Sequence, residues 1–153
     1  MDIIFDIDGT LMNLEHRVHF VNGPKYDQKN FELGIKDDMP IPEMVALFET
    51  LAEHDGNRII FCTGRREKTR KDTQLQIDKL TKDILQRNSS LKFPIYMRAD
   101  GDHRSDPDVK SDLYDQMLAD GFNPRLIFED RASVVKMWRA RGLRCLQVAE
   151  GNF

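Results

Sequence analysis

Cysteine is scarce in this sequence, and the cysteines stand far apart. The chain has two, Cys62 and Cys145, and each lies in an apolar run, RIIFC or RCLQV. Two thiolates cannot build a four-cysteine zinc site, and no CxxC pair indicates redox or zinc chemistry. We therefore expect two reduced cysteines in the core of a protein from a reducing compartment.

Long hydrophobic runs and an excess of one charge are missing as well. No apolar stretch is long enough to cross a bilayer, and no signal peptide opens the sequence, so we expect a soluble, cytoplasmic protein without a membrane partner. The net charge of -3, with 32% charged residues, does not indicate bulk coating of nucleic acid, although a local basic face is compatible with it. The 153 residues, 40% of them hydrophobic, suit a single domain over 1–153.

Short apolar segments alternate with segments of helical periodicity. The expected strands are 2–7, 58–62, 94–97, 125–129 and 143–148. The expected helices run from 42 to about 56, about 67 to 88, 109 to about 121, and 134 to 142. This alternation predicts an α/β three-layer sandwich with a central parallel sheet of about five strands. The mixed segment around 11–40 is expected to be an irregular, small cap-like excursion.

Polar side chains follow four of the expected strands. The four sets are Asp6-Ile7-Asp8-Gly9-Thr10, Thr63-Gly64-Arg65, the group Asp106, Asp108 and Lys110, and Glu129-Asp130-Arg131. In an open parallel sheet the ligand site lies beyond the carboxyl ends of the strands. We therefore expect these four sets to meet at one edge of the sheet.

Such a set of side chains suits phosphoryl transfer. Crowded carboxylates repel one another, and a hard divalent cation such as Mg²⁺, which prefers oxygen ligands, relieves the repulsion. A lysine, a hydroxyl and backbone N–H groups complete a receptor for a phosphoryl group, whose transfer needs mainly positioning and charge neutralisation. Asp6 suits the nucleophile because an aspartate is ionised at neutral pH and needs no base.

The same residues resemble the motifs of the haloacid dehalogenase (HAD) superfamily. The segment FDIDGT resembles the first motif, and Thr63, Lys110 and the Glu129-Asp130 pair resemble the other three in order. The resemblance implies a HAD-like Rossmannoid fold and a Mg²⁺-dependent phosphomonoesterase. It also implies an aspartyl-phosphate on Asp6 as the reaction intermediate.

The resemblance further implies a role for each matching residue. Asp8 would be the general acid and base, and Thr63 and Lys110 would bind phosphate oxygens. Asp6, the backbone carbonyl of Asp8, and Asp130 would hold Mg²⁺, and Glu129 would orient a metal-bound water. Gly9 would let the backbone turn so that its amides face the phosphate.

A narrower resemblance is to the 3′-phosphatase domain of the phage-type polynucleotide kinase-phosphatases. It rests on Arg17, eleven residues after Asp6, on TGR, on GDHRSDPDVK, and on IFEDRASVVKMWRARGLRCLQVAEGNF. It implies a substrate with a 3′-phosphate, either a nucleic-acid end or a nucleotide. It also implies a cytoplasmic location, including the cytoplasm of a phage-infected host cell. It adds Arg17, Gly64, Arg65, Asp106 and Arg131 to the substrate-binding residues.

The resemblance gives some of these residues a specific task. The forked donors of Arg17 and Arg65 would bind phosphate oxygens. Asp106 would orient Lys110 through an ion pair.

The chain departs from the family pattern at three points. Thr63 stands where serine is usual and keeps the hydroxyl. Glu129 stands where aspartate is common, and its longer side chain would move a metal-bound water. No G-x-x-x-x-G-K-[ST] motif occurs, so we predict no ATP-dependent 5′-kinase activity.

Other readings stay open on the sequence alone. A HAD phosphatase for small molecules, such as a 5′-nucleotidase or a sugar phosphatase, keeps every core motif and agrees better with the net charge of -3. A non-catalytic binding domain is a second alternative. It is disfavoured by four intact residues, Asp6, Asp8, Lys110 and Asp130. Asp106 alone could be a helix N-cap. The sequence does not indicate the oligomeric state or a preference for DNA or RNA.

Overall fold

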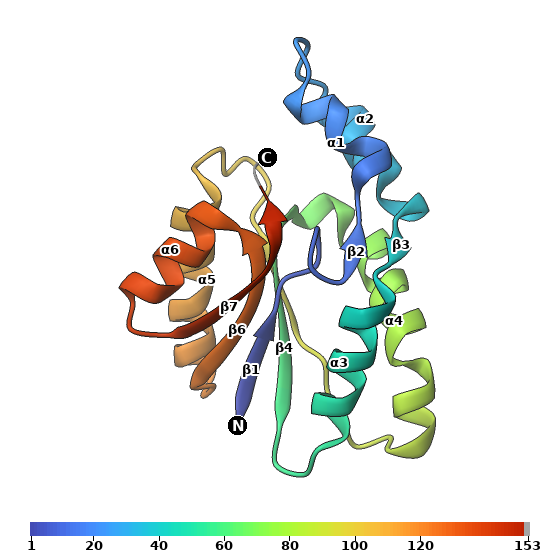
Figure 1. Ribbon diagram of the computed structural model, residues 1–153, viewed down its shortest axis with the longest axis vertical. Coiled ribbons are helices and arrows are strands. Elements are labelled where there is room, and N and C mark those ends of the chain that lie inside the picture. Colours follow the sequence, from blue (N-terminus) through green and yellow to red (C-terminus); the bar gives the residue numbers. More distant parts are fainter. Residues whose placement is uncertain (152–153) are drawn as a thin grey trace.

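The central element of the fold is a parallel sheet of five strands. The computed structural model describes residues 1–151 and leaves out 152–153, the end of the C-terminal segment that carries the resemblance. The strands are β1 (Asp2–Phe5), β4 (Arg58–Arg66), β5 (Ile95–Arg98), β6 (Pro124–Arg131) and β7 (Arg144–Gly151). Their order is β5-β4-β1-β6-β7, with every pair parallel (Figure 1). The predicted α/β fold with a five-stranded parallel sheet is confirmed.

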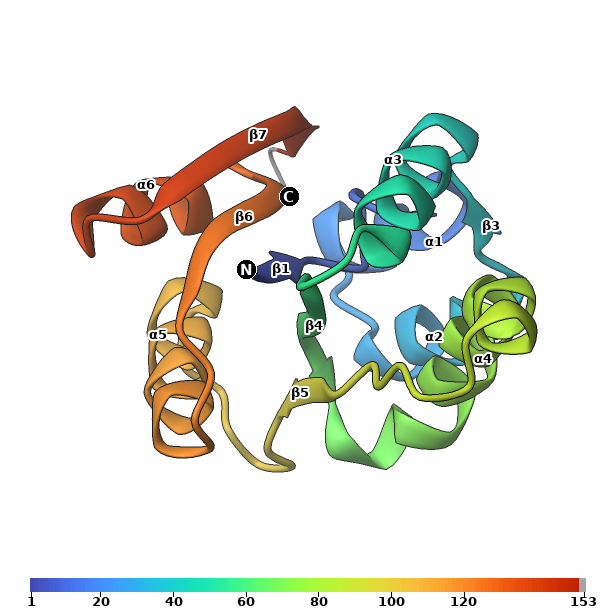
Figure 2. The same ribbon diagram turned by 90° about the horizontal axis from the view of Figure 1, so that it is seen from below.

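Helices cover both faces of this sheet, as the view along the strands in Figure 2 shows. One face carries α3 (Pro42–Glu53) and α4 (Arg70–Arg87), and the other carries α5 (Asp106–Ala119) and α6 (Ala132–Ala140). Because both faces are covered, the central strand β1 is buried at all four positions. No helix among the described residues is long and apolar enough to span a membrane.

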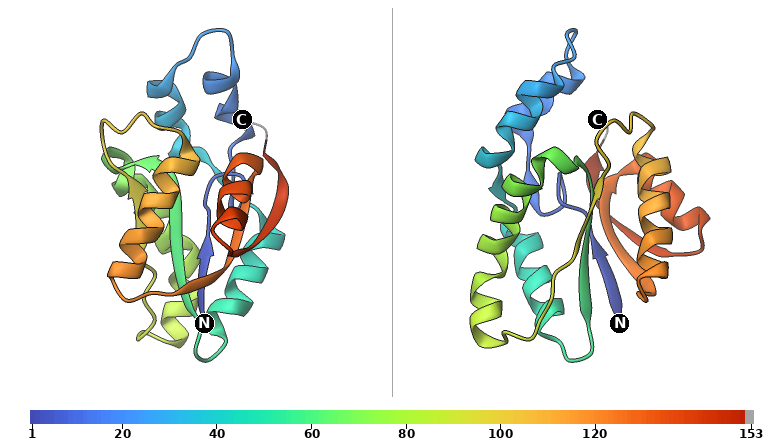
Figure 3. Two further views of the ribbon diagram at one scale, coloured as in Figure 1. Left: turned by 90° about the vertical axis from the view of Figure 1, so that its left-hand side faces the viewer. Right: turned by 180° about the vertical axis from the view of Figure 1, so that it is seen from behind.

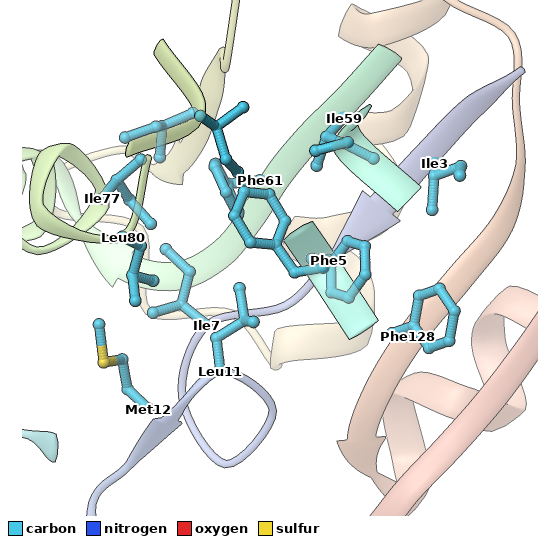
Figure 4. Close-up of a cluster of buried hydrophobic side chains, with 14 of the residues drawn as sticks. Ile3, Phe5, Ile7, Leu11, Met12, Ile59, Phe61, Ile77, Leu80 and Phe128 are labelled. Carbon is cyan, nitrogen blue, oxygen red and sulfur yellow. The ribbon is translucent and has the colours of Figure 1, made fainter. Parts of the chain in front are cut away.

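The alternating side chains of β1 divide the core into two clusters. Phe5 lies on the face covered by α3 and α4 and stacks on Phe128 of β6, with ring centroids 4.5 Å apart (Figure 4). Ile4 points to the opposite face and joins the cluster around Trp138. Cys62 and Cys145 are free and buried in this second cluster, as predicted. Both clusters therefore pack on β1, β4 and β6, the strands whose carboxyl ends carry most of the predicted site.

Three strands run further than the sequence predicted, and one of them is β7, because the expected strand 143–148 continues to Gly151. The expected strand 58–62 continues through Thr63-Gly64-Arg65 to Arg66, because β4 shifts register after Thr63 and pairs again with β5 at Arg98. The expected strand 125–129 likewise continues as β6 to Arg131. The polar motifs therefore sit on the last residues of strands, where the sheet limits their movement.

The cap-like excursion is more regular than predicted. A short antiparallel pair, β2 (Met12–Asn13) and β3 (Met39–Pro40), closes its base. Between them lie α1 (Glu15–Asn22), α2 (Gln28–Leu33) and the 3₁₀ turn η1 (Gly34–Asp37). Figures 1 and 3 show α1 and α2 projecting beyond the carboxyl ends of the strands. The segment thus forms a wall on one side of the edge where the predicted site lies.

Candidate active site

Three buried carboxylates meet at the carboxyl ends of β1 and β6. Asp6 directly follows β1, and Glu129 and Asp130 lie just before the last residue of the neighbouring strand β6, in register through the pair Phe5 and Phe128. One carboxylate oxygen from each of Asp6, Glu129 and Asp130 lies within 4.8 Å of the others. Parallel pairing thus brings residues more than 120 positions apart into a single group of oxygen ligands.

Glycine at position 9 is required by this geometry. Gly9 has a φ of +80°, and a Cβ there would stand 2.2 Å from Oδ2 of Asp130. Any side chain would therefore displace the Asp130 carboxylate as well as strain the backbone.

Lys110 lies between two of these carboxylates. Its buried Nζ donates to Oδ1 of Asp6 at 2.6 Å and to Oε2 of Glu129 at 2.7 Å. Burial acts against the ammonium charge, but Asp6 and Glu129 outweigh burial and raise the pKa of Lys110 well above its ordinary value. The lysine is therefore charged and fixed beside Asp6.

One lysine does not neutralise three carboxylates. Burial, with the charge of Glu129, raises the pKa of Asp6 to about 7 although Lys110 opposes the shift, so the expectation that Asp6 is fully ionised at neutral pH fails for the metal-free protein. Burial, with the charge of Asp6, raises the pKa of Asp130 to about 6. A hard divalent cation relieves this type of repulsion and takes oxygen ligands. The donor set therefore fits Mg²⁺, with Asp6 and Asp130 as the residues that would hold it.

These raised pKa values predict how stability depends on pH. The ordinary value for aspartate is 3.8, so the folded, metal-free protein binds more protons at Asp6 and Asp130 than the unfolded chain does up to about pH 7. Their contribution to stability is complete below the unfolded pKa and is lost as pH rises through the folded pKa.

We therefore expect the Tm in EDTA to fall between about pH 5 and pH 7.5, and Mg²⁺ to restore most of the loss. Differential scanning fluorimetry with and without Mg²⁺ measures both effects. The Asp130→Asn variant should show a shallower fall and a weaker response to Mg²⁺. A Tm in EDTA that does not fall over this range would contradict this assignment of charge.

Asp8 faces a different environment from Asp6. Its Oδ1 accepts a hydrogen bond at 2.6 Å from Nη2 of Arg17 and another at 2.6 Å from Nη2 of Arg65. Burial alone would raise the pKa of Asp8, but the two arginines outweigh it and lower the pKa to about 2. The carboxylate of Asp8 lies outside the cluster of Asp6, Glu129 and Asp130. The side chain of Asp8 is therefore not placed to bind Mg²⁺, which agrees with the expectation that Asp8 would bind the metal through its backbone carbonyl.

The sequence analysis missed Asp38, which anchors both arginines. Its carboxylate accepts two hydrogen bonds from Arg17, each 2.6 Å, and one from Nη2 of Arg65 at 2.8 Å. Asp38 is buried between η1 and β3, so the cap itself supplies the counter-charge for the two arginines. No motif singles out this residue, and only the need to balance two buried guanidinium groups could have indicated it.

Asp38→Asn should therefore disturb the site without touching the phosphoryl position. The asparagine amide carries no negative charge, so the two buried guanidinium groups lose part of their counter-charge. Breaking a buried ion pair in this way costs about 3–5 kcal/mol of stability when no other partner compensates. Because Asp8 remains as a second partner, we expect a lower Tm together with a roughly tenfold loss of kcat. Thermal unfolding and steady-state kinetics test this, with the exposed neighbour Asp37→Asn as the control. Equal Tm and kcat for the two variants would contradict the anchoring role.

The expected ion pair between Asp106 and Lys110 is wrong. Asp106 instead pairs with Arg98, at the end of β5, and with Nη1 of Arg131 at 2.5 Å. Asp106 is not the N-cap of α5 either, because the side chain of Ser105 caps that helix. Arg98, which the sequence analysis did not select, also donates through Nε to the backbone oxygen of Gly64 at 3.0 Å. This group links the ends of β4, β5 and β6 beside the carboxylate cluster.

One cleft of about 480 Å³ contains nearly all of the predicted site. The predicted residues that line it are Asp6, Asp8, Thr63, Gly64, Arg65, Asp106, Lys110, Glu129, Asp130 and Arg131. Thr63 is buried, and its Oγ1 accepts a hydrogen bond from the backbone N–H of Arg65 at 3.2 Å. Arg17 is the exception, since it lies fully buried behind Asp8 and does not line the cleft.

This fold and this group of residues define a phosphatase of the HAD superfamily. The sequence model of the family described as the polynucleotide kinase PNKP phosphatase domain matches residues 1–153. The chain therefore belongs to the PNKP phosphatase family.

Solved structures agree with this assignment. Two chains from Pnkp1/Rnl/Hen1 complexes, one described as an RNA repair complex, are 27% and 26% identical to this chain, with TM-scores of 0.71 and 0.72. The match covers 99% of this chain but 46% and 43% of theirs, so this chain spans less than half of their length. A haloacid dehalogenase-like hydrolase from Streptococcus pneumoniae, SP0104, has 17% identity and a TM-score of 0.60, with 95% and 83% coverage, and supports the fold alone.

Proposed function

We propose that this phosphatase removes the 3′-phosphate from a polynucleotide end or from a nucleoside 3′-monophosphate, through an aspartyl-phosphate on Asp6. The observation that carries the proposal is the convergence of Asp6, Lys110 and Asp130 in one cleft. Membership of the PNKP phosphatase family supports the nucleic-acid substrate. The cytoplasm stays the expected location.

In the first step a carboxylate oxygen of Asp6 attacks phosphorus, and the bond from phosphorus to the 3′ oxygen breaks. The leaving oxygen takes a proton from Asp8, which yields a free 3′-hydroxyl. In the second step Asp8 removes a proton from water, and this water attacks the phosphorus of the aspartyl-phosphate. Inorganic phosphate leaves, and Asp6 regains its carboxylate.

Other groups in the cleft stabilise the charge of the transferring phosphoryl group. Mg²⁺, when bound by Asp6, Asp130 and the backbone carbonyl of Asp8, would neutralise charge on the phosphoryl oxygens. Lys110 supplies a fixed positive charge beside Asp6, and the Thr63 hydroxyl supplies a donor. Glu129 holds Lys110 from the other side.

The low pKa of Asp8 has a consequence for its role as an acid. With Arg17 and Arg65 bound to it, Asp8 is ionised at neutral pH and ready to act as the base of the second step. Before the first step it must gain a proton. A phosphate dianion that enters the cleft raises the pKa of Asp8 by its charge and competes for the guanidinium of Arg65, which also lines the cleft. Substrate binding thus prepares Asp8 to act as an acid.

A substrate panel with and without Mg²⁺ tests this function. The panel contains a 3′-phosphorylated oligonucleotide, the matching 5′-phosphorylated one, and nucleoside 3′- and 5′-monophosphates. We expect turnover of the 3′-phosphates in Mg²⁺ and none in EDTA. Turnover of 5′-monophosphates alone would favour the small-molecule phosphatase, which the net charge of -3 also suits.

A further inference from the structure

The cleft is larger than the transfer of a phosphoryl group requires. Its volume of about 480 Å³ falls in the range of sites for whole small ligands. The carboxylates, Lys110 and Thr63 occupy the edge of the sheet, whereas the cap supplies a separate wall with Val21, Tyr26 and Phe31. Figure 3 shows the cap projecting well beyond the strand ends that carry the phosphoryl site. This wall is available to the part of the substrate next to its phosphate.

Tyr26 presents the accessible ring of this wall. It precedes α2, lines the cleft and is 66% exposed. Among residues 1–151, no other ring or guanidinium group stacks on it. Phe31 is different, because the guanidinium of Arg17 lies 4.3 Å from its ring centroid and covers one face. Phe31 therefore fixes Arg17, and Tyr26 keeps its face free for a ligand.

A chain of hydrogen bonds holds Tyr26 in position. Its hydroxyl donates to Oε1 of Gln28, and Nε2 of Gln28 donates to Oε1 of Glu32 at 2.9 Å. Glu32 is buried and forms an ion pair with Lys68 at 2.6 Å, in the turn η2 (Glu67–Thr69) that follows β4. The exposed ring is thus linked through Gln28 and Glu32 to the turn that follows β4, which limits the entropy lost on stacking.

Cations stand among the other residues of the same cleft. Arg66 and Arg104 line it, Arg104 from the loop between β5 and α5. Figure 1 shows this loop and the cap rising on opposite sides of the strand ends. A ring for bases together with cations for phosphates is the arrangement that binds single-stranded nucleic acid with little sequence preference.

We propose that Tyr26 is a specificity residue that stacks on the base of the 3′-terminal nucleotide while its phosphate lies at Asp6. This inference rests on the proposed function, because it needs a substrate with a base near the phosphate. It assigns the recognition of nucleic acid to the cap and leaves the chemistry to the ends of the strands.

The test compares two 3′-phosphorylated oligonucleotides, one with a normal terminal nucleotide and one whose terminal nucleotide lacks its base. Tyr26→Ala should lower kcat/KM on the normal substrate about tenfold through KM, which is about 1.4 kcal/mol. It should leave kcat/KM on the abasic substrate unchanged, and Tyr26→Phe, which keeps the ring but loses the hydrogen bond to Gln28, should recover most of the loss on the normal substrate. Leu33→Ala is the matched control, since Leu33 is a 57% exposed residue of the cap that does not line the cleft.

The results separate this inference from the proposed function. If the wild type removes the 3′-phosphate but Tyr26→Ala loses the same factor on both substrates, or none, the stacking role is wrong and the proposed function stands. If the wild type hydrolyses small phosphomonoesters but neither oligonucleotide, the proposed substrate is wrong and the stacking role falls with it.

Discussion

Asp6→Asn should reduce turnover of a 3′-phosphorylated oligonucleotide by roughly four orders of magnitude or more. The asparagine amide is a poor nucleophile and cannot form the aspartyl-phosphate. Neither the formation nor the hydrolysis of this intermediate can then take place. The measurement is kcat with saturating substrate and Mg²⁺. Asp83→Asn is the matched control, because Asp83 is exposed on α4 and its change should leave kcat unaltered.

The same variant should not unfold. Asp6 repels Glu129 and Asp130 in the metal-free protein, and burial already raises its pKa to about 7. We expect the Tm of Asp6→Asn in EDTA to equal or exceed that of the wild type, because the substitution relieves this repulsion and leaves Lys110 paired with Glu129. Wild-type turnover in a folded Asp6→Asn protein would remove Asp6 from the mechanism.

Lys110→Met should damage both activity and stability. Methionine keeps the length of the side chain but removes the charge beside the nucleophile, and loss of one such stabilising donor lowers kcat by about 10²- to 10³-fold. It also leaves Asp6 and Glu129 buried without their cation, which costs about 3–5 kcal/mol when one partner of a buried pair is removed. Activity assays and thermal unfolding in EDTA measure the two losses.

Mg²⁺ provides an internal control for this variant. Bound near Asp6 and Asp130, it supplies part of the missing positive charge, so the Tm of Lys110→Met should rise more with Mg²⁺ than that of the wild type. Lys82→Met, on the exposed face of α4, should match the wild type in every assay. A Lys110→Met protein with the wild-type Tm in EDTA would show that the lysine does not balance these carboxylates.

The sequence predicted the sheet and the main site residues because both follow from strong local patterns. Apolar runs identify the buried strands, and parallel pairing places their carboxyl ends together whatever the intervening segments do. Asp6 and Lys110 are 104 positions apart, and their contact follows from this topology. The structure confirms the fold and brings the two residues within hydrogen-bonding distance.

The partners of individual charges were not predictable in the same way. Asp106 and Lys110 lie one turn apart on α5, and this spacing favours an ion pair between the two side chains. In the fold, Lys110 contacts the buried Asp6 and Glu129 instead, and Asp106 meets Arg98 and Arg131. Such choices depend on distances between elements, which no single segment encodes.

The cap was underpredicted for a related reason. Helices of a core usually show an apolar stripe, but the buried residue of α1 is Arg17. The cap is attached through Arg17, Asp38 and Arg65 rather than through apolar packing alone. A search for hydrophobic periodicity therefore finds no helix there, and Asp38 and Tyr26 were overlooked.

The central claim is that the Asp6 carboxylate itself accepts the phosphoryl group. The most direct test mixes the wild-type enzyme with excess 3′-phosphorylated oligonucleotide and Mg²⁺, quenches within the first turnover, and reduces any acyl phosphate with borohydride. Peptide mass spectrometry should then find homoserine at position 6, and none without substrate or in Asp6→Asn. The opposite result would be conversion of substrate to inorganic phosphate while position 6 remains aspartate in every quenched sample. That result would contradict the account.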